Sequence, residues 1–231
     1  MQSLHQGQVI HPASALALEQ NKVLRNTYMM LALTMIPTVL GAFVGMSINF
    51  SFMAASPIIS ALLMFGAMMG LMFAVQALRD SAWGVVALLG FTFVAGVLLG
   101  PILQVALNLR NGAELIGMAA AGTGIIFFSL ATLATVTKKD FSFMGKFLFI
   151  GLILLIVASL ANLFFQIPAL SLTISAIGVM IFSAYILFDV SRIVNGGETN
   201  YVMATLGLFL SIYNLFSSLL HLLMAFSGQR D

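Results

Sequence analysis

Long apolar stretches separated by short polar connections dominate the sequence. Each stretch is near the roughly 20 residues that a helix needs to cross about 30 Å of hydrocarbon. Apolar residues occupy every side of the expected helices instead of one stripe, which is typical of segments that face lipid. The predicted membrane-spanning segments are residues 28–50, 57–78, 82–104, 113–136, 144–165, 169–188 and 201–226. The pattern therefore predicts an all-α integral membrane protein: a seven-helix domain over residues 28–231, preceded by a cytosolic tail over residues 1–27.

Composition supports this class and excludes several others. Hydrophobic residues make up 61% of the chain and charged residues only 7%, against roughly 25% charged residues in a soluble domain. The net charge of +2 is too small to indicate a nucleic-acid partner. The chain has no cysteine, which excludes disulfides, thiolate metal sites and thiol nucleophiles. No cleaved signal peptide is expected at the N-terminus.

The basic residues alternate between the two sides of the predicted bundle. Only Arg110 and Arg230 fall on one side, and the other side carries Lys22, Arg25, Arg79, Lys138, Lys139, Lys146 and Arg192. Because cytoplasmic connections are enriched in lysine and arginine, we expect a cytoplasmic N-terminus and, after seven crossings, a periplasmic C-terminus. The connections on the outer side are short, so no sizeable outer domain is expected.

The N-terminal tail contains a weakly amphipathic segment over residues 13–26. It carries Lys22 and Arg25, and we expect it to lie at the membrane interface as a lead-in to the first spanning helix. His5 and His11 are expected to be solvated. The alternative is a tail that binds a partner protein.

Pairs of glycines spaced four residues apart occur in the first three apolar stretches: Gly41 with Gly45, Gly66 with Gly70, and Gly96 with Gly100. Such pairs let helix backbones approach closely in a membrane. Pro101 follows the last pair and is expected to kink or end the third helix, because proline cannot donate the helical hydrogen bond.

The stretch from residue 184 to residue 221 concentrates the polar residues of the apolar region. Asp189 lies at the inner end of the sixth predicted helix. On the seventh, a single helical face carries a polar stripe of Gly207, Ser211, Asn214, Ser218 and His221, at spacings of four, three, four and three. Between the two helices, Asn195, Gly196, Gly197, Glu198 and Thr199 form a turn. Its glycines are expected to end helix six, and Thr199 or Asn200 to cap helix seven.

Ionisable residues within membrane segments are candidates for function, and each also has a structural interpretation. Glu114 can interact favourably with the N-terminus of its helix, and Arg79 can extend its guanidinium to the interface. Asp189 and Arg192 are three residues apart and can form a surface ion pair. His221 is more typical of an interfacial or hydrogen-bonded histidine than of a metal ligand. Alternatively, protonation of Asp189 makes or breaks an ion pair with Arg79 or Arg192.

The templates of enzyme sites do not fit. Ser217 and His221 share one helix and lack the G-x-S-x-G setting of a hydrolase nucleophile. An aspartyl site needs two carboxylates, and only Asp189 lies at suitable depth. One intramembrane histidine without cysteine completes no haem or zinc site. We therefore expect no catalytic, cofactor or metal-binding residues.

Several segments resemble the Bax inhibitor (TMBIM) family of seven-helix membrane proteins. They are KVLRNTYMMLALT from Lys22, LLGPIL from Leu98, KKDFSFMG from Lys138, and GGETNYVMAT followed by LSIYNLFSSLL. The resemblance implies a bundle of six helices around a central seventh. It also implies a calcium or proton leak controlled by two aspartates that share a proton, one on helix six and one on helix seven, and by an arginine on helix two.

This chain departs from that family pattern at one of its functional positions. Asp189 matches the first aspartate and Arg79 the arginine, but Ser211 stands where the second aspartate is expected, followed by Asn214. Without a second carboxylate, the repulsion that keeps one proton bound is lost, and a calcium ion would meet one negative charge fewer.

More narrowly, the chain resembles the bacterial members of this family that modulate the FtsH membrane protease. That resemblance implies an inner-membrane protein whose partners are the lipid bilayer and the FtsH complex or its regulators. The alternative function is a pH-influenced calcium or proton leak with Asp189 at its cytoplasmic gate. A partner would engage residues 1–26 or the loops around Lys138 and Lys146.

Overall fold

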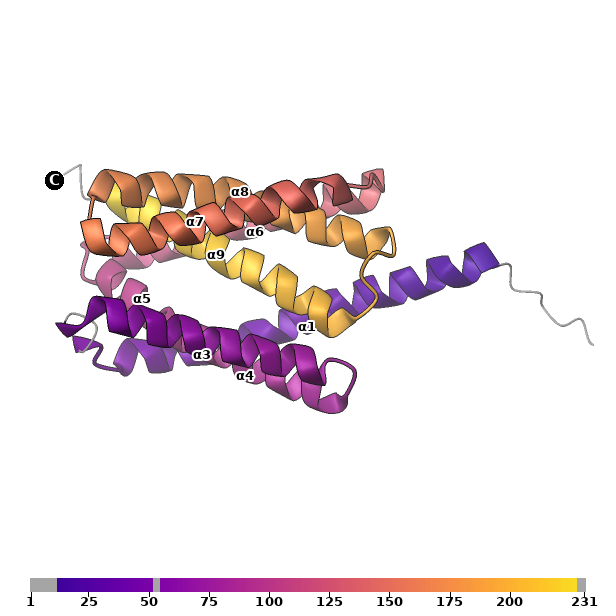
Figure 1. Ribbon diagram of the computed structural model, residues 1–231, viewed down its shortest axis with the longest axis horizontal. Helices are drawn as coiled ribbons and strands as arrows, with labels where there is room; N and C mark the ends of the chain where they lie inside the picture. The colour runs from indigo at the N-terminus through magenta and orange to yellow at the C-terminus, as the bar shows by residue number, and fades with distance from the viewer. Residues whose placement is uncertain (1–11, 52–54, 228–231) are drawn as a thin grey trace, which may run out of the picture.

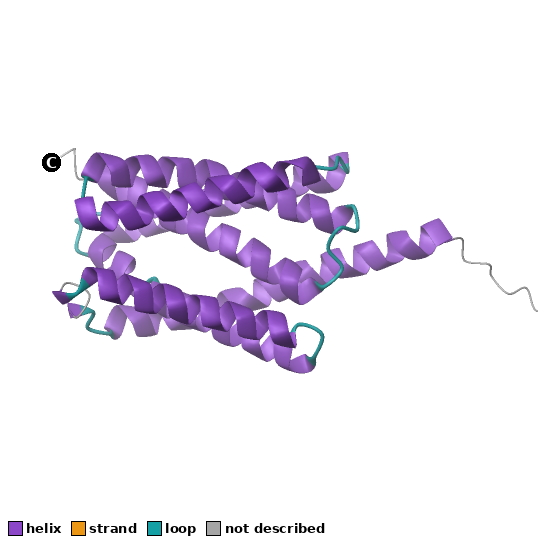
Figure 2. Cartoon of the chain, viewed as in Figure 1, coloured by secondary structure: helices purple, strands orange, loops and turns teal. Residues whose placement is uncertain are grey.

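The computed structural model describes residues 12–51 and 55–227, with side-chain burial from residue 18 onward. This part of the chain folds into helices joined by short connections, with no strand (Figure 2). The main elements are α1 (Pro12–Ser47), α3 (Pro57–Leu78), α4 (Ala82–Leu98), α5 (Gly100–Leu107), α6 (Gly112–Thr137), η1 (Ser142–Met144), α7 (Gly145–Phe165), α8 (Pro168–Val194) and α9 (Tyr201–Ser227). Within the described residues, seven helical segments are long and apolar enough to cross a membrane, which confirms the predicted fold class.

Helix α1 is longer than the first predicted spanning segment. The segment over residues 13–26 continues directly into that spanning helix, because α1 runs without interruption for 36 residues, or about 54 Å at 1.5 Å per residue. Hydrocarbon accounts for only about 30 Å of that length. The N-terminal part of α1 therefore projects beyond the bundle along the helix axis (Figure 1). His5, His11 and Arg230 lie outside the described residues.

The predicted break before Pro101 divides the third spanning segment into α4 and α5. Leu99 separates the two helices, and Pro101 has no N–H to bond the carbonyl of Val97. Helix α5 then presents Gln104, whose Nε2 lies 3.2 Å from the carbonyl oxygen of Gly45 and 2.9 Å from that of Met46. The break therefore places an amide group where it caps the C-terminal end of α1.

The two ends of the bundle differ in charge. One end, the basic end, holds the projecting part of α1 and the α3–α4, α6–α7 and α8–α9 connections (Figure 1). Its cations include Lys22, Arg25, Arg79, Lys138, Lys139 and Arg192. The opposite end holds the α5–α6 and α7–α8 connections and the end of α9. The separation of charge follows the predicted alternation, and a cytoplasmic location of the basic end stays a prediction.

Helix α9 contributes more buried residues than any other helix, including Leu208, Phe209 and Leu215. It contacts α1, α3, α4, α5, α6 and α8. Helix α7 packs against α8, η1 and α3 and has no close backbone approach to α9 within the described residues. The encirclement of the seventh spanning helix by the other six, which the resemblance implied, is therefore incomplete at α7.

Candidate functional site

The carboxylate of Asp189 lies between α8 and α9, against a glycine. A methyl group on Gly207 would lie 3.4 Å from Oδ2 of Asp189, so the bare backbone at this position makes room for the carboxylate. Ser211 follows one turn later, and its Oγ lies 3.5 Å from the same Oδ2. The structure thus brings together three of the residues that the sequence singled out, with Asp189 half-buried and Ser211 buried.

The hydrogen bond between Ser211 and Asp189 is weak. Ser211 has a single hydroxyl hydrogen, and its Oγ lies closer to the carbonyl oxygen of Gly207, at 3.1 Å. The 3.5 Å separation from Asp189 is near the limit for a hydrogen bond. The partner of Asp189 on α9 is therefore a hydroxyl shared with the helix backbone, where a carboxylate was expected from the family pattern.

Arg192 does not form the i,i+3 ion pair with Asp189. Its Nη2 donates to the carbonyl oxygen of Gly197 at 3.0 Å and lies 3.6 Å from Oε2 of Glu198. The guanidinium carbon also stands 5.5 Å from the centre of the Phe188 ring, a cation–π geometry. Arg192 thus stabilises the α8–α9 turn, because the reversal of the chain brings Glu198 and the carbonyl of Gly197 to its guanidinium.

The turn itself ends α8 by a left-handed residue, as predicted. Gly196 has φ of +77°; its N–H bonds the carbonyl of Ile193 at 3.2 Å, and that of Gly197 bonds the carbonyl of Arg192 at 2.7 Å. These two bonds form a Schellman motif. Asn195 and Gly197 do not adopt the left-handed conformation, and Thr199 is exposed.

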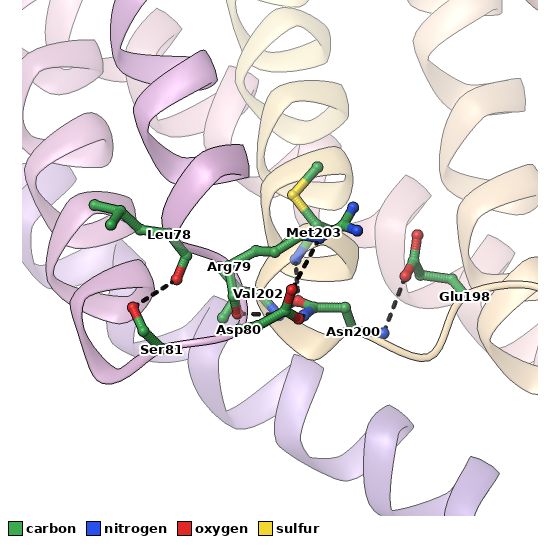
Figure 3. A network of polar contacts seen from close by, with 8 residues as sticks. All are labelled: Leu78, Arg79, Asp80, Ser81, Glu198, Asn200, Val202 and Met203. Carbon is green, nitrogen blue, oxygen red and sulfur yellow. Dashed lines mark hydrogen bonds and ion pairs between the residues drawn. The ribbon is translucent and has the colours of Figure 1, made fainter.

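Asn200 caps α9 and ties it to the α3–α4 turn (Figure 3). Its Oδ1 accepts the N–H groups of Val202 at 3.0 Å and Met203 at 3.1 Å, which is the predicted N-cap. Its Nδ2 donates to Oδ1 of Asp80 at 2.8 Å and to the carbonyl oxygen of Arg79 at 3.2 Å. One amide side chain therefore serves two connections that are distant in sequence.

Arg79 lies in this network instead of beside Asp189. Its Nε is 3.4 Å from Oδ2 of the adjacent Asp80, and both side chains are largely exposed. An exposed pair of neighbours contributes little to stability. The arginine that the resemblance places as a latch on Asp189 is thus engaged at the surface of the α3–α4 turn, away from α8.

A second cluster at the basic end was missed by the sequence analysis. Ser191 Oγ donates to the carbonyl oxygen of Lys139 at 3.0 Å and accepts the N–H of Phe141 at 2.9 Å. Asn195 Nδ2 donates to the carbonyl oxygen of Ser191 at 2.9 Å. Ser191 and Asn195 are four residues apart at the end of an apolar helix, which places their side chains on one helical face. In the sequence, this spacing was the indication that the two residues bind the same partner.

Asp140 shapes the α6–α7 connection in the same cluster. Its Oδ1 accepts the N–H of Ser142, the first residue of η1, at 2.8 Å. Hydrogen bonds from the side chain and the backbone of Ser142 lower the pKa of Asp140 below its usual range, because they favour the charged form. The carboxylate is fully exposed, so this effect is local to the loop.

The polar stripe of α9 does not stay in one environment. Asn214 donates to the carbonyl oxygen of Leu210 at 2.8 Å, and a methyl group on Gly178 of α8 would lie 2.7 Å from Oγ of Ser218. His221 is exposed on the outside of the bundle. The polar stripe repeats every 3.5 residues, so on a straight helix it drifts about 20° around the helix axis per heptad. The stripe therefore turns away from α8 toward the C-terminal end of α9.

Glu114 lies exposed in the first turn of α6 at the opposite end of the bundle, where the prediction placed it. The neighbouring Asn111 makes no side-chain cap. Its Oδ1 instead accepts a hydrogen bond from Oγ of Ser227 at 3.0 Å, which ties the start of α6 to the end of α9. Glu114 is thus remote from Asp189 and takes no part in its surroundings.

Among the described residues, the surroundings of Asp189 offer one carboxylate, one shared hydroxyl and no cation within ion-pair distance. Within the described residues, no three histidine, cysteine or acidic side chains gather into a group that could hold a metal ion. The chemistry that this site supports is the binding or release of a proton at a single carboxylate. Ser211, Asn214 and Ser218 are occupied mainly by contacts within the α8–α9 pair.

Comparison with known proteins gives consistent matches over nearly the whole chain. The family described as "Inhibitor of apoptosis-promoting Bax1" matches residues 20–228. The "Modulator of FtsH protease YccA" of Escherichia coli K12 is 40% identical over 206 residues, covering 89% of this chain and 91% of the relative. The same identity is found for the "Inner membrane protein YccA" of E. coli O6:H1. A protein of Pseudomonas aeruginosa is 44% identical over 88% of this chain and 89% of its own length.

The comparisons do not favour the alternative function. None of these descriptions names an ion or a transport activity. The calcium or proton leak predicted as the alternative therefore has no support from the relatives. At Asp189, the expected second carboxylate is replaced by a hydroxyl whose shorter hydrogen bond goes elsewhere.

Proposed function

We propose that this chain, which belongs to the Bax inhibitor family of membrane proteins, binds an FtsH-type protease or its regulators in the inner membrane and modulates proteolysis. The observation that carries the proposal is the 40% identity, over 89% of the chain, to a protein named as a modulator of FtsH protease. The similarity extends through the spanning helices and is not confined to one motif. In this proposal the chain acts by association and performs no catalysis.

The basic end supplies a surface suited to such an association. The projecting part of α1 continues the spanning helix without a break, as a helical arm. Leu18 on it is 67% exposed, and Glu19, Lys22 and Arg25 are also exposed. If the basic end faces the cytoplasm, as the distribution of lysine and arginine predicts, this arm reaches toward the cytoplasmic domain of a membrane protease.

The α6–α7 connection offers a second contact at the same end. Lys138 and Lys139 are exposed, and the connection is fixed to α8 by Ser191 and Asn195. A held loop loses less conformational entropy on binding than a free one. The opposite end presents only short connections, which leaves little surface for a large partner there.

Co-purification from detergent-solubilised membranes tests the proposal. The full chain is expected to retain the protease, and removal of residues 1–26 is expected to abolish the association. Arg110→Glu, at the opposite end, is the matched control and is expected to bind as the unaltered chain does. Degradation of a protease substrate, followed with and without the chain, provides the functional readout. Absence of association by the full chain would overturn the proposal.

A further inference from the structure

An apolar groove runs along the side of the bundle between α1 and α6. The two helices both pack on α9, yet their backbones do not approach each other closely. The space between them measures about 940 Å³. Its walls extend from Tyr28 to Met46 on α1 and from Ile116 to Val136 on α6, and Phe209, Ile212, Tyr213 and Phe216 of α9 form its floor.

The lining is suited to hydrocarbon. Apart from two tyrosines, its polar members are threonines, and Thr38, Thr123 and Thr135 donate their hydroxyl hydrogens to carbonyls four residues earlier on the same helix. Those hydroxyls therefore have no hydrogen left to donate to a ligand. At the basic end the rings of Tyr28 and Phe127 meet edge to face with centroids 6.2 Å apart, so side chains narrow the groove there.

The length of the groove suits a lipid chain. The 18-residue distance from Tyr28 to Met46 is about 27 Å along α1, close to the roughly 30 Å thickness of bilayer hydrocarbon. The hydrocarbon chains of bilayer lipids therefore lie at the same depth as the groove.

At the basic end, cations are next in sequence to the segments that form both walls of the groove. Arg25 lies one turn before Tyr28 on α1, and Lys138 and Lys139 follow the end of α6. All three are exposed, and within the described residues none of them forms an ion pair. Glu19 and Asp140 are the acidic residues nearby, which leaves a positive balance that attracts anionic lipid headgroups.

We propose that this groove binds an anionic phospholipid, with a hydrocarbon chain between α1 and α6 and the headgroup phosphate at Arg25, Lys138 and Lys139. The lipid then fills the space between two helices whose backbones do not approach each other closely. This inference does not rest on the association with a protease, because it follows from the groove and the cations next to its walls alone.

Two glycines of α6 provide a matched pair for the test. A side chain at Gly117 or at Gly124 meets no other atom within 4 Å of its Cβ, but only Gly124 lines the groove. The full chain is reconstituted in vesicles containing phosphatidylglycerol and phosphatidylethanolamine in equal amounts, and retained lipid is counted by native mass spectrometry. We expect the unaltered chain and Gly117→Phe to retain phosphatidylglycerol, and Gly124→Phe to retain about tenfold less.

The headgroup contact is tested separately by the combined variant Arg25→Gln, Lys138→Gln and Lys139→Gln. It is expected to keep a lipid in the groove but to lose the preference for phosphatidylglycerol. Undiminished retention by Gly124→Phe, or an undiminished preference in the combined variant, would overturn the proposal. Thermal unfolding of each variant confirms that it is folded.

A third measurement identifies the occupant directly. The chain has no cysteine, so Gly124→Cys carries a single site for a photo-reactive label. Cross-linking in the vesicles is expected to capture lipid. Capture of a second copy of the chain instead would show that the groove is a protein interface and would also overturn the proposal.

Discussion

The glycine pair of α1 and the pair that spans α4 and α5 have the same spacing as the glycine pair of α3 but opposite surroundings. A methyl group on Gly41 would collide with the carbonyl of Phe93, and one on Gly96 with the carbonyl of Thr38. A methyl group on Gly66 or on Gly70 would meet no other atom within 4 Å. The first set therefore lets two backbones cross in contact, and the second faces away from the bundle.

This difference shows that a small-residue pair creates an opportunity for close packing without selecting a partner. Lipid is as apolar as the helix surface, so no hydrophobic force directs one face inward. Helix α4 buries six residues, among them Gly96, whereas α3 buries only Ser60 and Val75. Helix α3 is thus held largely by its neighbour α4 and by the polar network at its C-terminal turn.

The largest effect is expected from Gly96→Leu at the crossing. The leucine side chain meets backbone and cannot be accommodated by a rotamer change, so the free energy of unfolding should fall by about 3 kcal/mol. Reversible unfolding in mixed detergent measures the loss. Gly66→Leu is the matched control, and an equal loss in that variant would show that the two glycine environments are not distinct.

A smaller loss is expected from Asn200→Ala, which removes the cap of α9 and the tie to the α3–α4 turn. Loss of an N-cap alone costs about 1–2 kcal/mol of unfolding free energy. Asn200→Asp keeps an acceptor for Val202 and Met203 but loses the Nδ2 donor, so its stability should lie between those of Asn200→Ala and the unaltered chain. If both variants unfold as the unaltered chain does, the network does not hold α3.

Gly178→Ala tests a close approach in which the obstacle is a side chain. The added methyl group meets Oγ of Ser218 at 2.7 Å, and a hydroxyl can rotate away, so we expect a loss of about 1 kcal/mol. Adding Ser218→Ala should recover most of that loss in the same unfolding measurement. If the double variant is no more stable than Gly178→Ala alone, the Ser218 hydroxyl is not the group that the added methyl group meets.

The smallest effect is expected from Gly70→Leu on the open face of α3. The new side chain projects into unoccupied space, so unfolding free energy should change by no more than about 0.5 kcal/mol. The same detergent titration measures it, with Gly45→Leu at the α1–α4 crossing as the destabilised reference. A loss comparable with that reference would mean that this face packs against a further partner.

The fold class, the family and the turn after α8 could be predicted because each depends on local sequence. Helix length follows from the apolar runs, and Gly196 is the residue type that tolerates the left-handed conformation a helix end requires. The break at Leu99 followed from Pro101. The length of α1 was harder to predict, because polar residues near its start resemble an interface and do not reveal that the helix continues.

The surroundings of the candidate site depended on tertiary contacts that the spacing of residues in the sequence does not specify. Sequence separation suggested that Arg192 pairs with Asp189, but the reversal at Gly196 brings Glu198 and the carbonyl of Gly197 to its guanidinium. Arg79 was expected near α8 and instead neighbours Asp80. In both cases the charged side chain found a partner supplied by a turn, whose position is set by how the helices meet.

The sequence alone determined that this chain forms apolar membrane-spanning helices of a recognisable family, because hydropathy, glycine and proline act over a few residues. Only the tertiary structure decided which glycines interlock, where Arg79 and Arg192 bind, and that α1 and α6 leave a groove over α9. The physical reason is that helix faces in lipid are nearly equivalent in hydrophobicity. Their partners are therefore chosen by shape and hydrogen bonding across helices distant in sequence.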